Sequence, residues 1–231
     1  MLNQTRKRVI AALISAAPAM GFAQAAADPL TVLIDQGKYW QAHKRGDLAE
    51  QAWQKVLRIN PKRQVPVLIH GDLEIFDSTQ IFEYLETIRP EPALWPAEAK
   101  ARARARLLEH KSDEVYFPPI IRLMGLQGAP DDPAAVEARA AALAFYDELE
   151  RAIGTEEWLA GSYSYADIAF YMAQLFGARM GAPMDEHHPR LQAWRDRMSA
   201  RPAVAKVAGA MGRYLLSQGR KLPPFLAKLS A

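Results

Sequence analysis

The chain of 231 residues contains no cysteine. This absence excludes disulfides, thiolate metal sites and a cysteine nucleophile. It identifies no compartment, because a cysteine-free protein is stable in either redox environment. Long apolar stretches are also missing, since none reaches the roughly 18 residues of a membrane-spanning helix. We therefore expect no integral membrane segment.

A large excess of positive or negative charge is missing as well. Arg6, Lys7 and Arg8 are the only charged residues among the first 25, and they account for the whole formal net charge of +3. The rest of the chain is neutral overall, so no basic field for a nucleic-acid partner is expected. Hydrophobic residues make up 50% of the chain and charged residues 24%. These proportions are those of a globular protein of one or two domains.

The first 25 residues allow two interpretations. The charged start, the uncharged stretch from Val9 to Phe22 and the small residues of Ala23-Gln24-Ala25 are typical of a secretory signal peptide. Such a signal would make the protein periplasmic or secreted, and without it the protein would be cytoplasmic. The alternative is a buried N-terminal strand or helix.

Residues 28–61 have the periodicity of a helix hairpin, with a turn at Gly46-Asp47. Gly37-x-x-Trp40, Ala49-x-x-x-Trp53 and Pro61 resemble one tetratricopeptide repeat. The segment is similar to the first periplasmic repeat of bacterial cellulose-export subunits. This resemblance implies an envelope scaffold linked to polysaccharide export as one alternative function.

From residue 62 to 90 the pattern changes to two short strands and a helix. Val65–Ile69 and Leu73–Phe76 alternate as strands around a turn, and Asp77-Ser78 caps the helix that follows. Residues 97–222 then predict an all-helical bundle, with helices at 97–125, 131–153, 164–179, 189–199 and 202–217. The predicted fold class is α+β, mostly α.

Two motifs in this region resemble the glutathione S-transferase family over about residues 60–231. The first is Gln64-Val65-Pro66 before a strand, followed by Asp77-Ser78 at the start of a helix. The resemblance implies an incomplete thioredoxin-like portion and glutathione as co-substrate. It also implies a cis Pro66, pairing of Val65 with the cysteinyl backbone, and binding of the γ-glutamyl group by Gln64, Asp77 and Ser78.

The second motif runs from Trp158 to Ile168. Ser164-x-x-Asp167 predicts a capping box, and Tyr163 with Ile168 predicts a hydrophobic staple. The family carries this motif at the start of its central helix. We therefore expect Asp167 to serve folding and assign it no catalytic role.

Ser15 is the one candidate for a catalytic residue that the sequence offers. The family's first strand ends in a Tyr, Ser or Cys that hydrogen-bonds the glutathione sulfur, and here that region holds the signal-like segment and the helix hairpin. One alignment makes Val9–Ile14 the first strand and Ser15 the activating hydroxyl. Cleavage after Ala25 would remove both. It would leave the hairpin of residues 65–76 with an open edge and favour a non-catalytic binding or structural protein.

The resemblance also implies an apolar electrophile as second substrate, and a homodimer. Four residues of the first long bundle helix could line the electrophile's pocket, although core packing explains them equally well: Tyr116, Phe117, Ile120 and Met124. His187-His188 carries no ligand spacing, so we expect loop histidines and no metal site.

Overall fold

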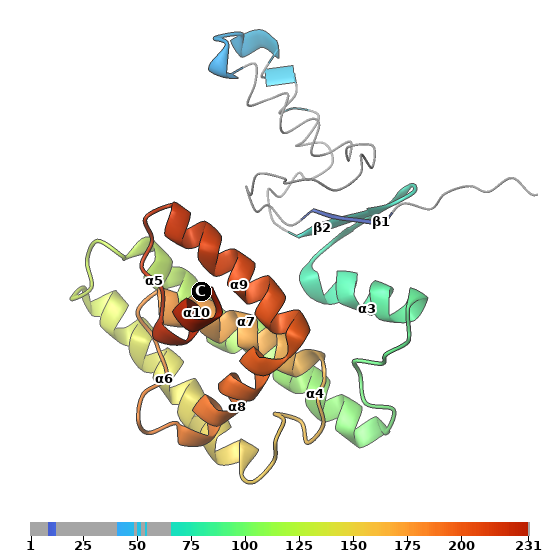
Figure 1. Ribbon diagram of the computed structural model, residues 1–231, viewed down its shortest axis with the longest axis vertical. Helices are drawn as coiled ribbons and strands as arrows, with labels where there is room; N and C mark the ends of the chain where they lie inside the picture. The colour runs from blue at the N-terminus through green and yellow to red at the C-terminus, as the bar shows by residue number, and fades with distance from the viewer. Residues whose placement is uncertain (1–8, 13–40, 49, 52–53, 55–65, 231) are drawn as a thin grey trace, which may run out of the picture. The chain divides into compact units, whose positions relative to one another are not determined.

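The computed structural model describes residues 9–12, 41–48, 50–51, 54 and 66–230 (Figure 1). The chain divides into two compact units, Met1–Pro92 and Ala93–Ala231. The fold class is α+β and mostly α, as predicted: a thioredoxin-like part with a small sheet precedes a helical domain.

The described part of the first unit contains a three-stranded sheet in the order β1-β2-β3. The strands are β1 (Val9–Ala12), β2 (Val67–His70) and β3 (Leu73–Phe76). β2 pairs antiparallel with both neighbours, with Leu68 opposite Ala11 on one side and Ile75 on the other. Val67 and Leu68 are buried, which fits a central strand.

β1 covers one edge of β2. An open edge was expected only if cleavage after Ala25 removed this strand, and that expectation stays a prediction. Residues 9–12 are therefore part of the sheet, as the alternative alignment requires. The turn between the two short helical segments at 41–54 lies at His43 and Lys44, just before the predicted Gly46-Asp47.

Helix α3 (Ser78–Ile88) follows β3 directly. Ile81 and Phe82 form its buried side. The ring of Tyr84 on α3 meets the ring of His70 on β2 edge to face at 5.8 Å, and its hydroxyl is hydrogen-bonded to His70 Nδ1. The helix is thereby fixed to the end of the central strand.

The second unit is a bundle of helices joined by turns and loops (Figure 1). The predicted helix 97–125 is α4 (Ala99–Lys111), a π-helical turn (Ser112–Tyr116) and α5 (Phe117–Gly125) in succession. The other four predicted helices are confirmed within two residues at their ends, and the last helix was not predicted. They are α6 (Pro133–Ile153), α7 (Tyr165–Arg179), α8 (Pro189–Ala200), α9 (Pro202–Ser217) and α10 (Pro224–Ser230).

The core of this unit is aromatic. Phe170 of α7 packs against Tyr116, Tyr146 and Trp194, with ring centroids 5.3 to 6.1 Å apart. Tyr116, Tyr146 and Trp194 are fully buried. Such ring pairs stabilise a core beyond the area that they bury.

Two glycines let α10 lie against α9. A Cβ at Gly209 would come within 2.4 Å of the Leu229 carbonyl oxygen, and one at Gly212 within 1.8 Å of Ser230 Oγ. Both distances are shorter than side-chain atoms tolerate. Within the described residues, no helix is long and apolar enough to cross a bilayer.

Candidate functional site

The start of α3 carries the predicted glutathione contacts. Asp77 is the N-cap residue, and its Oδ1 accepts from the backbone N–H groups of Thr79 at 3.0 Å and Gln80 at 3.1 Å. Its backbone lies at φ 80° and ψ 129°. A non-glycine residue with this positive φ is strained by about 1–3 kcal/mol, and such residues concentrate at functional sites.

Ser78 is the first residue of α3 and is half-buried. It follows the strained Asp77 at the helix end where backbone N–H groups and the positive end of the helix dipole meet an anion. Pro66, directly before β2, is half-buried. The structure therefore places Asp77, Ser78 and Pro66 around the same strand–helix unit. Ser15, Gln64 and Val65 lie outside the described residues, as does the Val65–Pro66 peptide bond.

The four residues predicted for an electrophile pocket have different environments. Tyr116 and Ile120 are fully buried in the core. Phe117 is half-buried and its ring lies 5.7 Å from that of Phe176, whereas Met124 is 49% exposed. The structure does not bring all four to one cavity of the second unit, and their role toward an electrophile stays a prediction.

Tyr116 belongs to a buried chain of hydroxyl groups. The hydroxyls of Tyr116 and Tyr146 are hydrogen-bonded to each other, and Tyr146 donates to the Ala182 carbonyl at 3.0 Å. Because the Tyr146 proton is used there, the Tyr116 hydroxyl must donate to Tyr146. Burial raises the pKa of both phenols above their ordinary value, so both stay neutral at physiological pH.

The predicted capping box is present at the start of α7. Asp167 Oδ2 accepts from Ser164 N at 2.9 Å, and Oδ1 accepts from Leu159 N at 3.0 Å and Trp194 Nε1 at 2.9 Å. Burial raises the pKa of the Asp167 carboxyl, although these hydrogen bonds oppose the shift. The carboxyl group is fully engaged in joining α7 to the preceding loop and to α8, which is a structural role.

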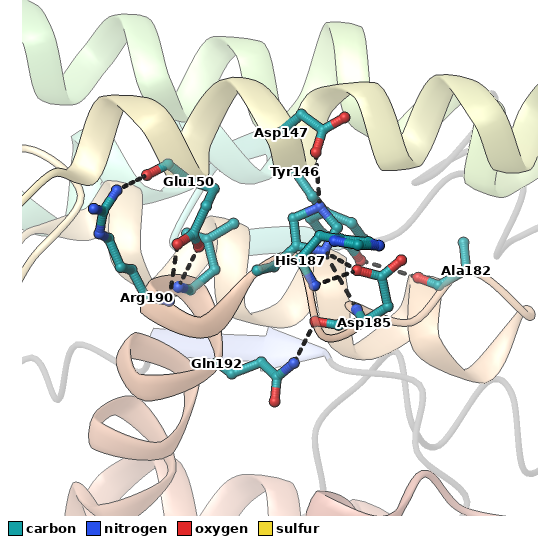
Figure 2. Close-up of polar contacts among 10 residues, drawn as sticks. Tyr146, Asp147, Glu150, Ala182, Asp185, His187, Arg190 and Gln192 are labelled. Carbon is teal, nitrogen blue, oxygen red and sulfur yellow. Dashed lines mark hydrogen bonds and ion pairs between the residues drawn. The ribbon is translucent and has the colours of Figure 1, made fainter.

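The buried His188 is part of a second polar cluster, whose carboxylates are partly exposed and which is shown in Figure 2. Its Nε2 lies 3.2 Å from Asp147 Oδ1 on α6, and its Nδ1 lies 2.8 Å from Asp185 Oδ1. Only 2% of its side chain is exposed, whereas His187 is exposed. The sequence placed both histidines in a loop, and nothing in their spacing signalled the partner on α6.

Glu150 of α6 completes this cluster by capping another helix. Its two carboxylate oxygens accept from the backbone N–H groups of Arg190 at 3.0 Å and Leu191 at 2.9 Å, at the start of α8 (Figure 2). A carboxylate at a helix N-terminus is favourable for the dipole and satisfies free N–H groups. Among the described residues, no group of three or more His, Asp or Glu side chains could hold a metal ion.

Two family models match the chain. The N-terminal domain of glutathione S-transferases matches residues 42–93, and the C-terminal domain matches residues 107–202. The first match begins before Asn60, inside the segment that resembles a tetratricopeptide repeat. The family resemblance therefore covers more of the chain than its motifs indicated.

Individual proteins agree with these models. The chain is 32% identical to a probable glutathione S-transferase, GSTF2, of Oryza sativa subsp. japonica, over 66% of this chain and 75% of that protein. A crystal structure of a glutathione S-transferase from Rhodospirillum rubrum matches with a TM-score of 0.64 and 29% identity, over 77% of this chain and 83% of that one. One from Methylobacterium radiotolerans, in complex with glutathione sulfonate, matches with a TM-score of 0.57 and 25% identity, over 64% and 74%.

The structure combines a small sheet, a helix that begins after Asp77 with Ser78, and a helical bundle with a buried capping box. This combination defines a two-domain transferase fold. The chain belongs to the glutathione S-transferase family.

Proposed function

We propose that the protein binds glutathione at the start of α3 and conjugates it, through its thiol sulfur, to an apolar electrophile. The observation that carries the proposal is the strained Asp77 followed by Ser78 at the N-terminus of an 11-residue helix. A related structure from Methylobacterium radiotolerans holds glutathione sulfonate, which supports the choice of ligand.

Each polar group at the start of α3 has a role in this proposal. The Ser78 hydroxyl and the Ser78 backbone N–H donate to the γ-glutamyl carboxylate. Asp77 Oδ1 is occupied by Thr79 N and Gln80 N. The other oxygen, Oδ2, accepts no hydrogen bond from the described residues and is available to the α-ammonium group. Gln64 and Val65 bind the rest of the tripeptide, as the family resemblance implies.

Ser78→Ala tests this arrangement. We expect isothermal titration to give a dissociation constant for glutathione at least about tenfold higher than that of the unmodified protein, because a hydrogen bond to a charged group contributes about 1.5–3 kcal/mol. Thr87→Ala is the matched control, because it changes a hydroxyl at the other end of the same helix, where Thr87 Oγ1 bonds the Glu83 carbonyl at 2.8 Å. Equal affinities for the Ser78 and Thr87 variants would contradict the proposed site.

The proposal assigns activation of the thiol to Ser15. β1 ends at Ala12, which lies opposite Val67 of β2, and Ser15 follows three residues later in the sequence. A hydroxyl there would hydrogen-bond the glutathione sulfur and favour the thiolate. This role requires that residues 1–25 are retained, which favours the cytoplasmic alternative over export.

Ser15→Ala is expected to lower kcat/KM for glutathione and 1-chloro-2,4-dinitrobenzene by about 10²–10³, the usual cost of losing one donor to a developing anion. The dissociation constant for glutathione should change little, because the γ-glutamyl contacts remain. Ser15→Thr keeps the hydroxyl and should retain part of the activity. Unchanged activity in Ser15→Ala would remove Ser15 from the mechanism while leaving the binding site intact.

A further inference from the structure

The turn before α8 holds a buried histidine, His188, whose Nδ1 faces two different groups of Asp185. The backbone N–H of Asp185 donates to Nδ1 at 3.3 Å. The carboxylate oxygen Oδ1 of Asp185 lies 2.8 Å from the same nitrogen. A hydrogen bond from the N–H requires an unprotonated Nδ1, whereas a hydrogen bond to the carboxylate requires a protonated one. The two bonds therefore exclude each other, and the proton on Nδ1 decides which of them forms.

The other ring nitrogen, Nε2, has one partner in both states. It lies 3.2 Å from Asp147 Oδ1 on α6 and can donate to it whether the ring is neutral or charged. In the neutral ring the single proton belongs on Nε2, because an unprotonated Nε2 would face a carboxylate with no hydrogen atom between them. Nδ1 then accepts from Asp185 N. In the charged ring both nitrogens donate, one to Asp147 and one to Asp185 (Figure 2).

Asp185 connects the ring to the first turn of α8. Its Oδ1 also accepts from the backbone N–H of His187 at 2.9 Å, and its carbonyl accepts from the backbone N–H of His188 at 3.1 Å and from the side chain of Gln192. When Nδ1 is unprotonated, its lone pair and those of Oδ1 repel each other, so the carboxylate turns toward solvent. The side chain of Asp185 is 37% exposed, which leaves room for this rotation.

Two carboxylates contact the ring nitrogens of His188. The titratable and charged side chains around it are Asp147, Tyr146 and Glu150 of α6, Asp185, Glu186 and His187 of the turn, and Arg190 and Arg195 of α8. Among the described residues, only Asp147 and Asp185 pair with Nε2 and Nδ1. The two aspartates come from different elements, so a charged ring joins α6 to the turn through both of its nitrogens.

The other neighbours do not compete for the proton. Glu150 is engaged at the start of α8, where its carboxylate offsets the positive end of the helix dipole beside His188. The ring of Tyr146 meets the ring of His188 edge to face at 5.4 Å. Burial raises the pKa of the Tyr146 phenol above its ordinary value, so it stays uncharged. The change of charge in this cluster is therefore that of His188.

We propose that the turn between α7 and α8 is a pH-dependent switch operated by His188. At higher pH the neutral ring accepts from Asp185 N and donates only to Asp147. At lower pH the added proton lies on Nδ1, the ring donates to both aspartates, and Asp185 N loses its acceptor. Histidine side chains change charge between about pH 5 and 8, so the switch responds in that interval. The proposal does not depend on glutathione binding or on transferase activity.

The test is an NMR titration of the histidine rings in the ¹⁵N-labelled full-length protein from about pH 8.5 to about 5.5. In this interval the partly exposed carboxylates of the cluster stay ionised. We expect His188 to carry one proton, on Nε2, at the upper end and to gain a second, on Nδ1, as the pH falls. The backbone amide signal of Asp185 should shift with the same midpoint, because its acceptor is lost.

His188→Gln and His187→Gln form a matched pair, because they change neighbouring histidines of which only His188 is buried. His188→Gln should abolish the pH-dependent shift of the Asp185 amide, whereas His187→Gln should leave it intact. A thermal melt checks that the His188→Gln variant is folded. The ring spectra of the unmodified protein test the proposal without any substitution.

A His188 ring that keeps one protonation state across the whole interval would overturn the proposal, as would a neutral ring with its proton on Nδ1. So would an Asp185 amide signal that does not follow the titration of His188, that still shifts in the folded His188→Gln variant, or that stops shifting in the His187→Gln variant.

Discussion

Replacing Asp167 by alanine is expected to lower the free energy of unfolding by about 3–5 kcal/mol. The carboxylate accepts from Leu159 N, Ser164 N and Trp194 Nε1, and each buried donor left without a partner costs about 1–3 kcal/mol. The loss of a whole buried network belongs to the short list of changes that produce effects of this size. Urea denaturation followed by circular dichroism measures it.

Asp132→Ala is the matched control. Asp132 caps α6 in the same unit, but among the described residues its carboxylate accepts only from Ala134 N, at 2.8 Å, and the bond is exposed. Loss of such a cap costs about 1 kcal/mol. If the two aspartates were equally replaceable, Asp167 would be an ordinary helix cap, and the account of α7 as anchored through Asp167 to α8 would fail.

Gly177→Ala is the second change with a large expected effect. A Cβ at Gly177 would lie 2.0 Å from Tyr116 Oη and 3.2 Å from Ile120 Cδ1. The Tyr116 ring cannot move aside easily, because Phe145, Tyr146 and Phe170 pack around it. Overpacking costs about 1–3 kcal/mol or more, and the better helix propensity of alanine returns about 1 kcal/mol. We expect a net loss of about 2 kcal/mol.

Tyr116→Phe separates the steric cause from other effects of the alanine. Alone, it should cost about 1 kcal/mol, because it removes the donor to Tyr146 while Tyr146 keeps its bond to the Ala182 carbonyl. Combined with Gly177→Ala, it removes the atom that the new Cβ would meet. The double variant should therefore be more stable than the sum of the two single effects predicts. Strict additivity would show that the contact with Tyr116 Oη is not what makes Gly177 necessary.

The local part of the fold could be predicted from the sequence. Alternating residues identified β2 and β3, and Asp77-Ser78 identified the start of α3, because these signals lie within a few residues of one another. The capping box of Ser164 and Asp167 could be predicted from the sequence for the same reason. Periodic apolar residues and the Gly and Pro residues between them also marked the long helices of the bundle.

What the sequence did not reveal depends on contacts between distant segments. The pairing of β1 with β2 joins residues far apart in the chain, and a short apolar run suits a strand as well as a signal peptide. α10 has only seven residues, too few for a periodic pattern. Partners such as His188 with Asp147 or Glu150 with α8 are set by how helices pack, so neither residue type nor spacing signals them.

The central claim is that glutathione binds at the start of α3. Its most direct test is an NMR titration of the ¹⁵N-labelled full-length protein with glutathione up to about 10 mM. We expect the backbone amide signals of Ser78, Thr79 and Gln80 to shift in a saturable manner as the charged ligand binds beside them, while those at the start of α8 in the second unit stay in place. Saturable shifts confined to other parts of the chain, or no shift of the three α3 amides at 10 mM, would contradict the account.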